Sequence, residues 1–233
     1  MAGCRGLVLL GEVVRSRREG AGSAAWLRDL AAALDEIYGQ ERLAPFGFTR
    51  DGEIQGLLAP EADPLTAVLN AALGPGARRM RWVAVRGEAA ADPDGGGVPA
   101  TQRTGPVFVE ARRVIDGARA GHERLVLSTG RPDVDALLGD LAPALVDVLD
   151  GLTERQRTVA RMAVLEDLRQ SEVADRLNVR RATISVSFNR ARVRSLRRLV
   201  TGIRRVYSSG SGGPGQSAVT DERTLAPRDV LTE

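Results

Sequence analysis

The sequence contains no lysine, and cysteine and histidine occur once each, as Cys4 and His122. A single cysteine excludes an intrachain disulfide and favours a reducing compartment. One cysteine and one histidine are too few for a structural zinc site. Aromatic residues make up only 3% of the 233 residues, so few side chains are available for stacking on unpaired bases.

Long hydrophobic runs are also missing. The apolar run GLVLL near the start is followed by Gly11 and Glu12. It is too short for a secretory signal core and far too short to cross a bilayer. We therefore expect a cytoplasmic protein without a membrane partner.

The positive charge is concentrated in one segment of the chain. Residues 1–150 hold 17 arginines and 21 acidic residues, and residues 207–233 hold 2 and 4. Residues 151–206, in contrast, hold 14 arginines and 5 acidic residues. Replacement of every lysine by arginine is typical of a G+C-rich genome and needs no functional reason. The local excess of arginine predicts a surface that binds a polyanion, although the arginines could instead form a solvated face paired with acids of the first 150 residues.

Hydrophobic periodicity predicts an α+β region before this basic segment. The expected strands and helices alternate as β-α-β-β-α-β-α-β, which indicates a sandwich and not a run of parallel β-α-β units. We expect strands at 6–14, in a hairpin at 45–59, at 79–88 and at 123–129, and helices at 24–38, 63–74, 105–119 and 133–149. Asp51-Gly52 is a strong hairpin signal, because a two-residue type I′ turn needs positive φ at both positions.

Every element expected between residues 151 and 206 is a helix. Thr153 and Gln156 have the spacing of a capping box, and Asn178 tolerates the left-handed conformation that ends a helix. The stretch ATISVSF alternates like a strand, but at helical spacing Ile184 and Phe188 fall on one face together with Ala191, and this face continues toward Leu199. We prefer the helix because it also accounts for the flanking residues.

These residues resemble the helix-turn-helix of sigma-factor region four and of LuxR-type regulators. The segment LTERQRTVARMAVLEDLRQSEVADRLNVRRATISVSFNRARVRSLRRL shares the L-[TP]-x-R-[EQ]-R opening, the small alanine, the turn and the RAR close. It departs from the pattern at Arg169 and Arg180, where the family has Ser or Thr caps, and at Asn178, where it has Gly.

In such a motif the N-terminal part of the third helix enters the major groove. Arginine forms two hydrogen bonds with guanine, asparagine reads adenine, and Ser or Thr reaches base edges or phosphates. The candidate base-reading residues are Arg180, Arg181, Thr183, Ser185 and Asn189. The candidate phosphate contacts are Arg190, Arg192, Arg194, Arg197 and Arg198.

Carboxylates at the end of the first strand and in the hairpin suggest a possible Mg²⁺ site for phosphoryl transfer, with Glu12, Asp51 and Glu53 as candidates. The segments GEVVRSRREG, FTRDGEIQGLL, MRWVAVRGE and GPVFVEARRVI resemble the SatD family, which joins a palm-like domain to a C-terminal helix-turn-helix. The resemblance implies a ferredoxin-like, palm-type sandwich similar to nucleotidyl cyclases and GGDEF domains.

At its metal positions the sequence departs from the SatD pattern G-D-V-x-x-S-R and T-x-G-D-E-x-Q-G. Glu12 replaces the strand aspartate, and Gly52 replaces the hairpin aspartate. Asp51 is displaced by one residue and would face the other side of the strand. The alternative role of Asp51-Gly52 is to form the turn. We therefore expect at most a vestigial Mg²⁺ site and no catalysis, with Arg15, Ser16 and Arg17 as candidates for binding a phosphate-bearing ligand.

Together these patterns predict a DNA-binding transcriptional regulator. The expected parts are a palm-like domain at 1–130, a connecting helix at 131–151, a helix-turn-helix domain at 152–206 and a disordered tail at 207–233. The expected partners are double-stranded DNA, a second copy of the chain through Leu196, Leu199 and Ile203 or the 133–149 helix, and RNA polymerase. The alternatives are a Mg²⁺-dependent nucleotidyl-transfer or cyclase-like enzyme and a protein–protein adaptor that uses the helix-turn-helix.

Overall fold

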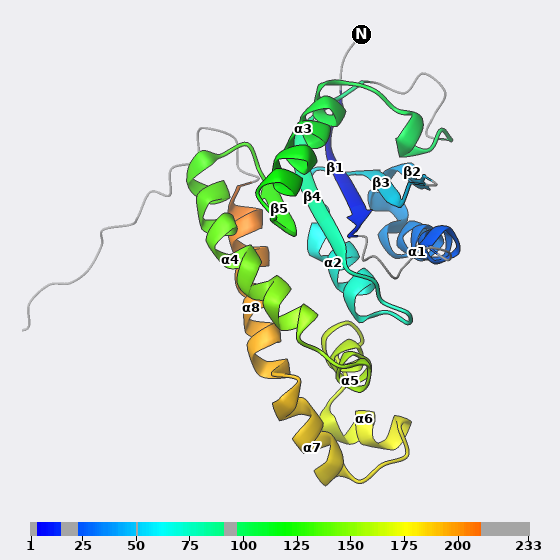
Figure 1. Cartoon of the computed structure of the whole chain (residues 1–233), viewed down its shortest axis with the longest axis vertical. Helices are drawn as coiled ribbons and strands as arrows, with labels where there is room; N and C mark the ends of the chain where they lie inside the picture. Colours follow the sequence, from blue (N-terminus) through cyan, green and yellow to red (C-terminus); the bar gives the residue numbers. More distant parts are fainter. Residues whose placement is uncertain (1–3, 15–22, 50, 91–96, 211–233) are drawn as a thin grey trace, which may run out of the picture.

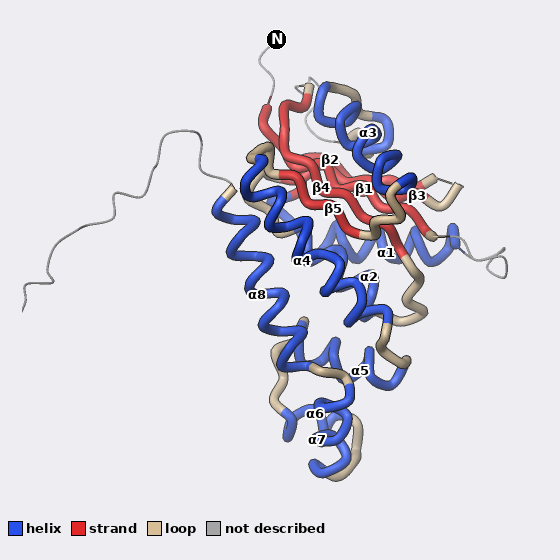
Figure 2. The backbone as a smooth tube through the Cα atoms, turned by 60° about the vertical axis from the view of Figure 1, so that its left-hand side comes forward, coloured by secondary structure: helices blue, strands red, loops and turns tan. Residues whose placement is uncertain are grey.

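The computed structural model describes residues 4–14, 23–49, 51–90 and 97–210, and the statements below concern these residues. A twisted sheet with flanking helices forms one end of the molecule, and further helices extend from it (Figure 1). Helices α4 (Pro132–Asp150) and α8 (Val193–Ser209) run side by side between the sheet and the far end. Helices α6 (Gln170–Arg176) and α7 (Arg181–Arg190) lie at that far end (Figures 1 and 2).

The sheet has five strands: β1 (Cys4–Val13), β2 (Arg42–Phe48), β3 (Glu53–Leu58), β4 (Met80–Ala89) and β5 (Leu125–Ser128). Their order across the sheet is β2-β3-β1-β4-β5. The first four strands pair antiparallel, as in a split β-α-β-β-α-β unit, and β5 pairs parallel to β4 at the edge. The predicted α+β class and the predicted order of elements are confirmed.

Helices cover both faces of the sheet because the central strand is apolar on both sides. Leu7 and Leu9 point to one face and contribute to the main core with α1 (Ser23–Tyr38) and α2 (Pro64–Leu73). On the opposite face, Val8 and Leu10 belong to two smaller clusters that include residues of α3 (Pro106–Ala120). Two short 3₁₀ helices, Gly39–Glu41 and Ala100–Gln102, complete this part.

The hairpin forms where Asp51-Gly52 predicted it, but its loop is longer than a two-residue type I′ turn. Thr49 N–H donates to Glu53 O at 2.8 Å, so three residues lie between the paired positions. Gly52 N–H donates to Thr49 O at 3.2 Å, and Gly52 has a φ of 94°. In three-residue hairpin loops a turn is commonly followed by a glycine at positive φ, and Gly52 occupies that position here.

The remaining chain forms five helices. They are α4 (Pro132–Asp150), α5 (Glu154–Val164), α6 (Gln170–Arg176), α7 (Arg181–Arg190) and α8 (Val193–Ser209). Buried residues of α4, α5, α7 and α8 belong to the same hydrophobic cluster as those of α1 and α2. The sheet and the helix-turn-helix therefore share one core, and α4 is a structural element of that core.

The last helix returns to the sheet. Tyr207 of α8 is 3% exposed, and the guanidinium of Arg86 on β4 lies 3.8 Å from the centre of its ring. Arg204 forms an ion pair of 2.8 Å with Asp63, the N-cap of α2. Helix α8 thus continues through Ser209, three residues beyond the boundary predicted at 206, and Tyr207 packs against the sheet domain.

Candidate nucleic-acid interface

Local hydrogen bonds define the start and the turn of the helix-turn-helix. Thr153 N–H donates to Gln156 Oε1 at 2.8 Å, and Gln156 N–H donates to Thr153 Oγ1 at 3.4 Å, which is the predicted capping box. Asn178 has a φ of 49°, the left-handed conformation expected of it. Arg169 N–H donates to Glu172 Oε2 at 2.6 Å, so a glutamate supports the start of α6, where a Ser or Thr cap is absent.

ATISVSF is helical, as its flanks indicated. Ile184, Phe188 and Ala191 are buried and share the main core with Val173 and Ala174 of α6. Burial therefore outweighs the strand preference of the alternating pattern.

The predicted continuation of this helix to Leu199 is wrong. Helix α7 ends at Arg190, and Arg192 has a φ of 48°, which separates α7 from α8. The break lets α8 run along α4, where Leu196 and Ile203 are each 0% exposed. The surface predicted for a homodimer is thus partly covered within the chain.

The outer face of α7 carries most of the predicted base-reading residues. Arg180, Arg181, Thr183 and Asn189 are exposed, and Ser185 is half-buried. Helix α7 lies at the end of the molecule farthest from the sheet (Figures 1 and 2).

Val186 is a member of this face that the sequence reasoning missed. Its side chain is 51% exposed, although alternation with Ile184 and Phe188 suggested a buried residue. An exposed aliphatic group on a recognition helix is suited to contact with the methyl group of thymine. The helical period could have indicated this exposure, because residues 184 and 186 lie on nearly opposite sides of a helix and Ile184 is buried.

Most arginines of this region have no intramolecular ion pair. Among the described residues, no carboxylate pairs with Arg180, Arg181, Arg190, Arg192, Arg194 or Arg198. Two of the nearby acids pair with other arginines: Glu166 pairs with Arg161 and Arg176 at 3.4 and 2.8 Å, and Asp167 pairs with Arg197 at 3.0 Å. The idea that these six arginines neutralise acids of the first domain is thus not supported by their contacts.

Arg197 differs from the other candidates for phosphate contact. Its Nη2 donates to the carbonyl oxygen of Ala163 near the end of α5 and lies 3.0 Å from Asp167 Oδ1. Asp167 has a φ of 51°, in the turn after α5. Arg197 therefore joins α8 to the end of α5, and, among the described residues, its guanidinium is engaged within the protein, unlike those of the other predicted phosphate contacts.

Beside α7 lies a groove of about 460 Å³. Thr153, Arg155 and Gln156 at the start of α5 form one wall. Thr183, Val186, Ser187 and Arg190 of α7 form the other. A second hollow of about 310 Å³ is lined by Arg190 and Arg192, which are two of the five predicted phosphate contacts.

The candidate metal residues are held by arginines. Glu12 on β1 lies between Glu53 on β3 and Arg81 on β4, and its carboxylate accepts hydrogen bonds from Arg81 and Arg119. Glu53 receives two bonds from Arg112, at 2.6 and 3.0 Å. Burial alone would raise the pKa of Glu12, but the hydrogen bonds and charges of Arg119 and Arg81 outweigh it and lower that pKa.

This arrangement does not fit a Mg²⁺ site. Three guanidinium groups already satisfy the two carboxylates on this face, and Asp51 stands in the loop. Within the described part of the chain, no group of three or more His, Cys, Asp or Glu side chains is placed to hold a metal ion. Arg15, Ser16 and Arg17 lie outside the described residues.

The helices that present α7 can be compared with known families. The Sigma-70, region 4 family matches residues 143–194. This range begins within α4, contains α5, α6 and α7, and ends in the first turn of α8. The match agrees with the resemblance read from residues 152–199 and covers less than a quarter of the chain.

No curated protein matches the chain. Among solved structures, one similar chain is a regulator of polyketide synthase expression from Bifidobacterium adolescentis, with 15% identity. The similarity covers 88% of this chain and 82% of that one, with a TM-score of 0.26.

The region 4 match and the exposed arginines of α7 indicate a DNA-binding regulator that carries a sigma-70 region 4 helix-turn-helix. No helix in the described ranges is long and apolar enough to span a membrane.

Proposed function

We propose that this protein regulates transcription by placing α7 in the major groove of a specific DNA site. The observation that carries the proposal is the outer face of α7, where exposed Arg180, Arg181 and Asn189 have no ion-pair or hydrogen-bond partner among the described side chains. In this position the two arginines are available for guanine and the asparagine for adenine. Arg190, Arg192, Arg194 and Arg198 then contact the phosphates that flank these bases.

The sheet domain, in this proposal, senses a ligand or mediates assembly and has a palm-type origin without catalysis. The absence of catalysis is supported by the ion pairs of this domain. Arg81, Arg112 and Arg119 bind the carboxylates that a Mg²⁺ ion would need as ligands. The same contacts weigh against a Mg²⁺-dependent nucleotidyl-transfer enzyme.

A homodimer remains part of the proposal, because a single helix-turn-helix buries little DNA surface. Leu196 and Ile203 are covered, so the remaining predicted surface is the half-buried Leu199 and α4, where Leu137 is 55% exposed. Sedimentation of the protein alone and on its DNA site tests this, and a monomer in both states contradicts it. RNA polymerase is proposed as a further partner on the strength of the region 4 motif.

The deciding experiment is capture of DNA. Full-length protein is incubated with sheared genomic DNA of its source at physiological salt, and the retained fragments are sequenced. A specific regulator enriches a few sites that share a sequence motif. Uniform retention would indicate phosphate contacts only, and no retention would favour the adaptor.

A further inference from the structure

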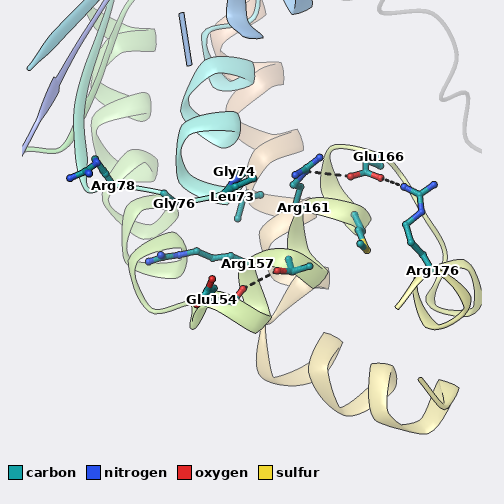
Figure 3. Close-up of a pocket in the computed structure, with 13 residues that line it drawn as sticks. Leu73, Gly74, Gly76, Arg78, Glu154, Arg157, Arg161, Glu166 and Arg176 are labelled. Carbon is teal, nitrogen blue, oxygen red and sulfur yellow. Dashed lines mark hydrogen bonds and ion pairs between the residues drawn. The ribbon is translucent and has the colours of Figure 1, made fainter. Parts of the chain in front are cut away.

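A cavity of about 860 Å³ lies between the sheet domain and the helix-turn-helix (Figure 3). The loop from Leu73 to Arg78, which joins α2 to β4, lines it on one side. Helix α5, Glu166 and Arg176 line it on the other. Its volume lies in the range of small-molecule sites, about 300–1,000 Å³.

Positively charged side chains outnumber negatively charged ones in this cavity. Four arginines and two glutamates line it: Arg78, Arg157, Arg161, Arg176, Glu154 and Glu166. Arg161 and Arg176 both pair with Glu166. Figure 3 shows Arg78 and Arg157 extended toward the opposite side, away from this carboxylate.

Arg78 and Arg157 lack partners among the described residues. The Nε atom of each is buried without a hydrogen bond, and neither guanidinium forms an ion pair. Glu154 lines the cavity but pairs with neither arginine. Asp150, the next carboxylate along this side, is held by Arg79 at 2.6 Å and Arg124 at 2.9 Å.

We propose that this cavity binds a small organic phosphate, with Arg78 and Arg157 as its anion ligands. A phosphate monoester carries about −1.5 to −2 charge at neutral pH and has three acceptor oxygens, which suits two unpaired guanidiniums. Leu73, Pro75, Ala77 and Met162 provide apolar wall for the carbon part of the ligand.

The position of the site gives it a regulatory role, which rests on the proposed function. Arg78 belongs to the sheet domain and Arg157 to α5, so a ligand bound by both stabilises one placement of the helix-turn-helix on the sheet domain. A ligand changes DNA affinity only if it binds the two placements differently, and DNA then changes ligand affinity by the same factor.

The test uses full-length protein and phenyl phosphate as the probe, followed by calorimetry. The proteins compared are the wild type, Arg78→Gln, Arg157→Gln and the control Arg205→Gln, which removes an exposed arginine of α8 outside the cavity. The wild type and the control are expected to bind one phenyl phosphate, more tightly than inorganic phosphate. Each cavity variant is expected to bind at least about tenfold more weakly.

Two results overturn the site. One is absence of saturable binding by the folded wild type, which needs no variant. The other is equal binding by all four proteins, which places the anion elsewhere. Genomic DNA capture with the same wild-type preparation separates the two proposals: DNA retention without phosphate binding overturns only the site, whereas arginine-dependent phosphate binding without DNA retention overturns only the regulator.

Discussion

Arginine plays two distinct parts in this protein. Arg81 and Arg119 bind a buried carboxylate in the sheet, and Arg197 binds a carbonyl oxygen at the end of a helix. Arg180 and Arg181 are exposed and have no ion-pair partner within the described ranges of the chain. The planar guanidinium suits both parts, because it donates several hydrogen bonds in fixed directions to a carboxylate, a phosphate or a guanine.

Arg181→Ala is expected to weaken binding to the specific DNA site by about 1–3 kcal/mol and to relax the preference at one base pair. The loss arises because an exposed arginine at the first position of α7 is placed for a guanine. Fluorescence anisotropy with specific and scrambled duplexes measures it, with Arg205→Ala as the control. Equal loss on both duplexes would show that Arg181 contacts only phosphate.

The neighbours Arg197 and Arg198 are expected to respond differently to truncation. Arg197→Ala lowers the free energy of unfolding by about 1 kcal/mol, because Ala163 O and Asp167 lose their partner. Arg198→Ala leaves stability within about 0.5 kcal/mol but lowers the slope of log K against log salt by about one unit. Urea unfolding and DNA titrations at several salt concentrations test the pair. An unchanged salt slope in Arg198→Ala would remove that residue from the phosphate contacts.

Glu12→Gln is expected to destabilise the protein most at neutral pH. The folded-state pKa of Glu12 is lowered, so its ion pairs contribute fully above the unfolded pKa of about 4.3 and are lost as pH falls through the folded pKa. Removing one partner of a buried pair costs about 3–5 kcal/mol. Urea unfolding of both proteins at pH 7 and pH 3 checks the trend. A stability difference that grows in acid would contradict it.

At the scale of elements, α7 shows how one helix serves two surfaces. Ile184 is 1% exposed and packs in the core, whereas Val186, two residues later, is 51% exposed. A strand would place both on the same face, so the pair also distinguishes helix from strand.

Substitution of this pair separates folding from DNA binding. Ile184→Ala is expected to lower the free energy of unfolding by about 2–5 kcal/mol because it leaves a cavity. Val186→Ala is expected to change stability by less than about 0.5 kcal/mol and to weaken binding to the specific site. Thermal unfolding and anisotropy measure the two effects. Loss of stability in Val186→Ala comparable to that in Ile184→Ala would contradict the helical placement.

The sequence predicted the elements well where their signals are local. The capping box at Thr153, the left-handed Asn178 and the helical ATISVSF all follow from neighbouring residues. It did not predict the end of α7 at Arg190, because α8 turns there to pack on α4, which is distant in sequence. The type I′ turn was wrong for a related reason, since the pairing of Thr49 with Glu53 sets the loop length.

At the scale of the molecule, α8 ties the DNA-binding helices to the sheet. Its last turns place Tyr207 against Arg86 of β4 and Arg204 against Asp63. Both parts contribute to one hydrophobic cluster. We therefore expect the described parts to unfold together.

Tyr207→Ala is expected to lower the free energy of unfolding by about 3 kcal/mol and to shift the melting of sheet and helices together. Tyr207→Phe is the control: it removes a buried hydroxyl that has no hydrogen-bond partner, so stability should fall little or rise. Differential scanning calorimetry measures both, and one transition with equal calorimetric and van't Hoff enthalpies is expected. Separate melting of the helices would contradict a shared core.

The sequence by itself determined the order of strands and helices and the helix-turn-helix, because periodicity and caps depend on residues close together in the chain. Only the tertiary structure decided which charges are free. Glu12 meets Arg119, Arg197 meets Ala163, and Arg78 approaches the same cavity as Arg157 because the chain folds back on itself. The charge available for a ligand depends on these distant pairings, which the composition of a segment does not contain.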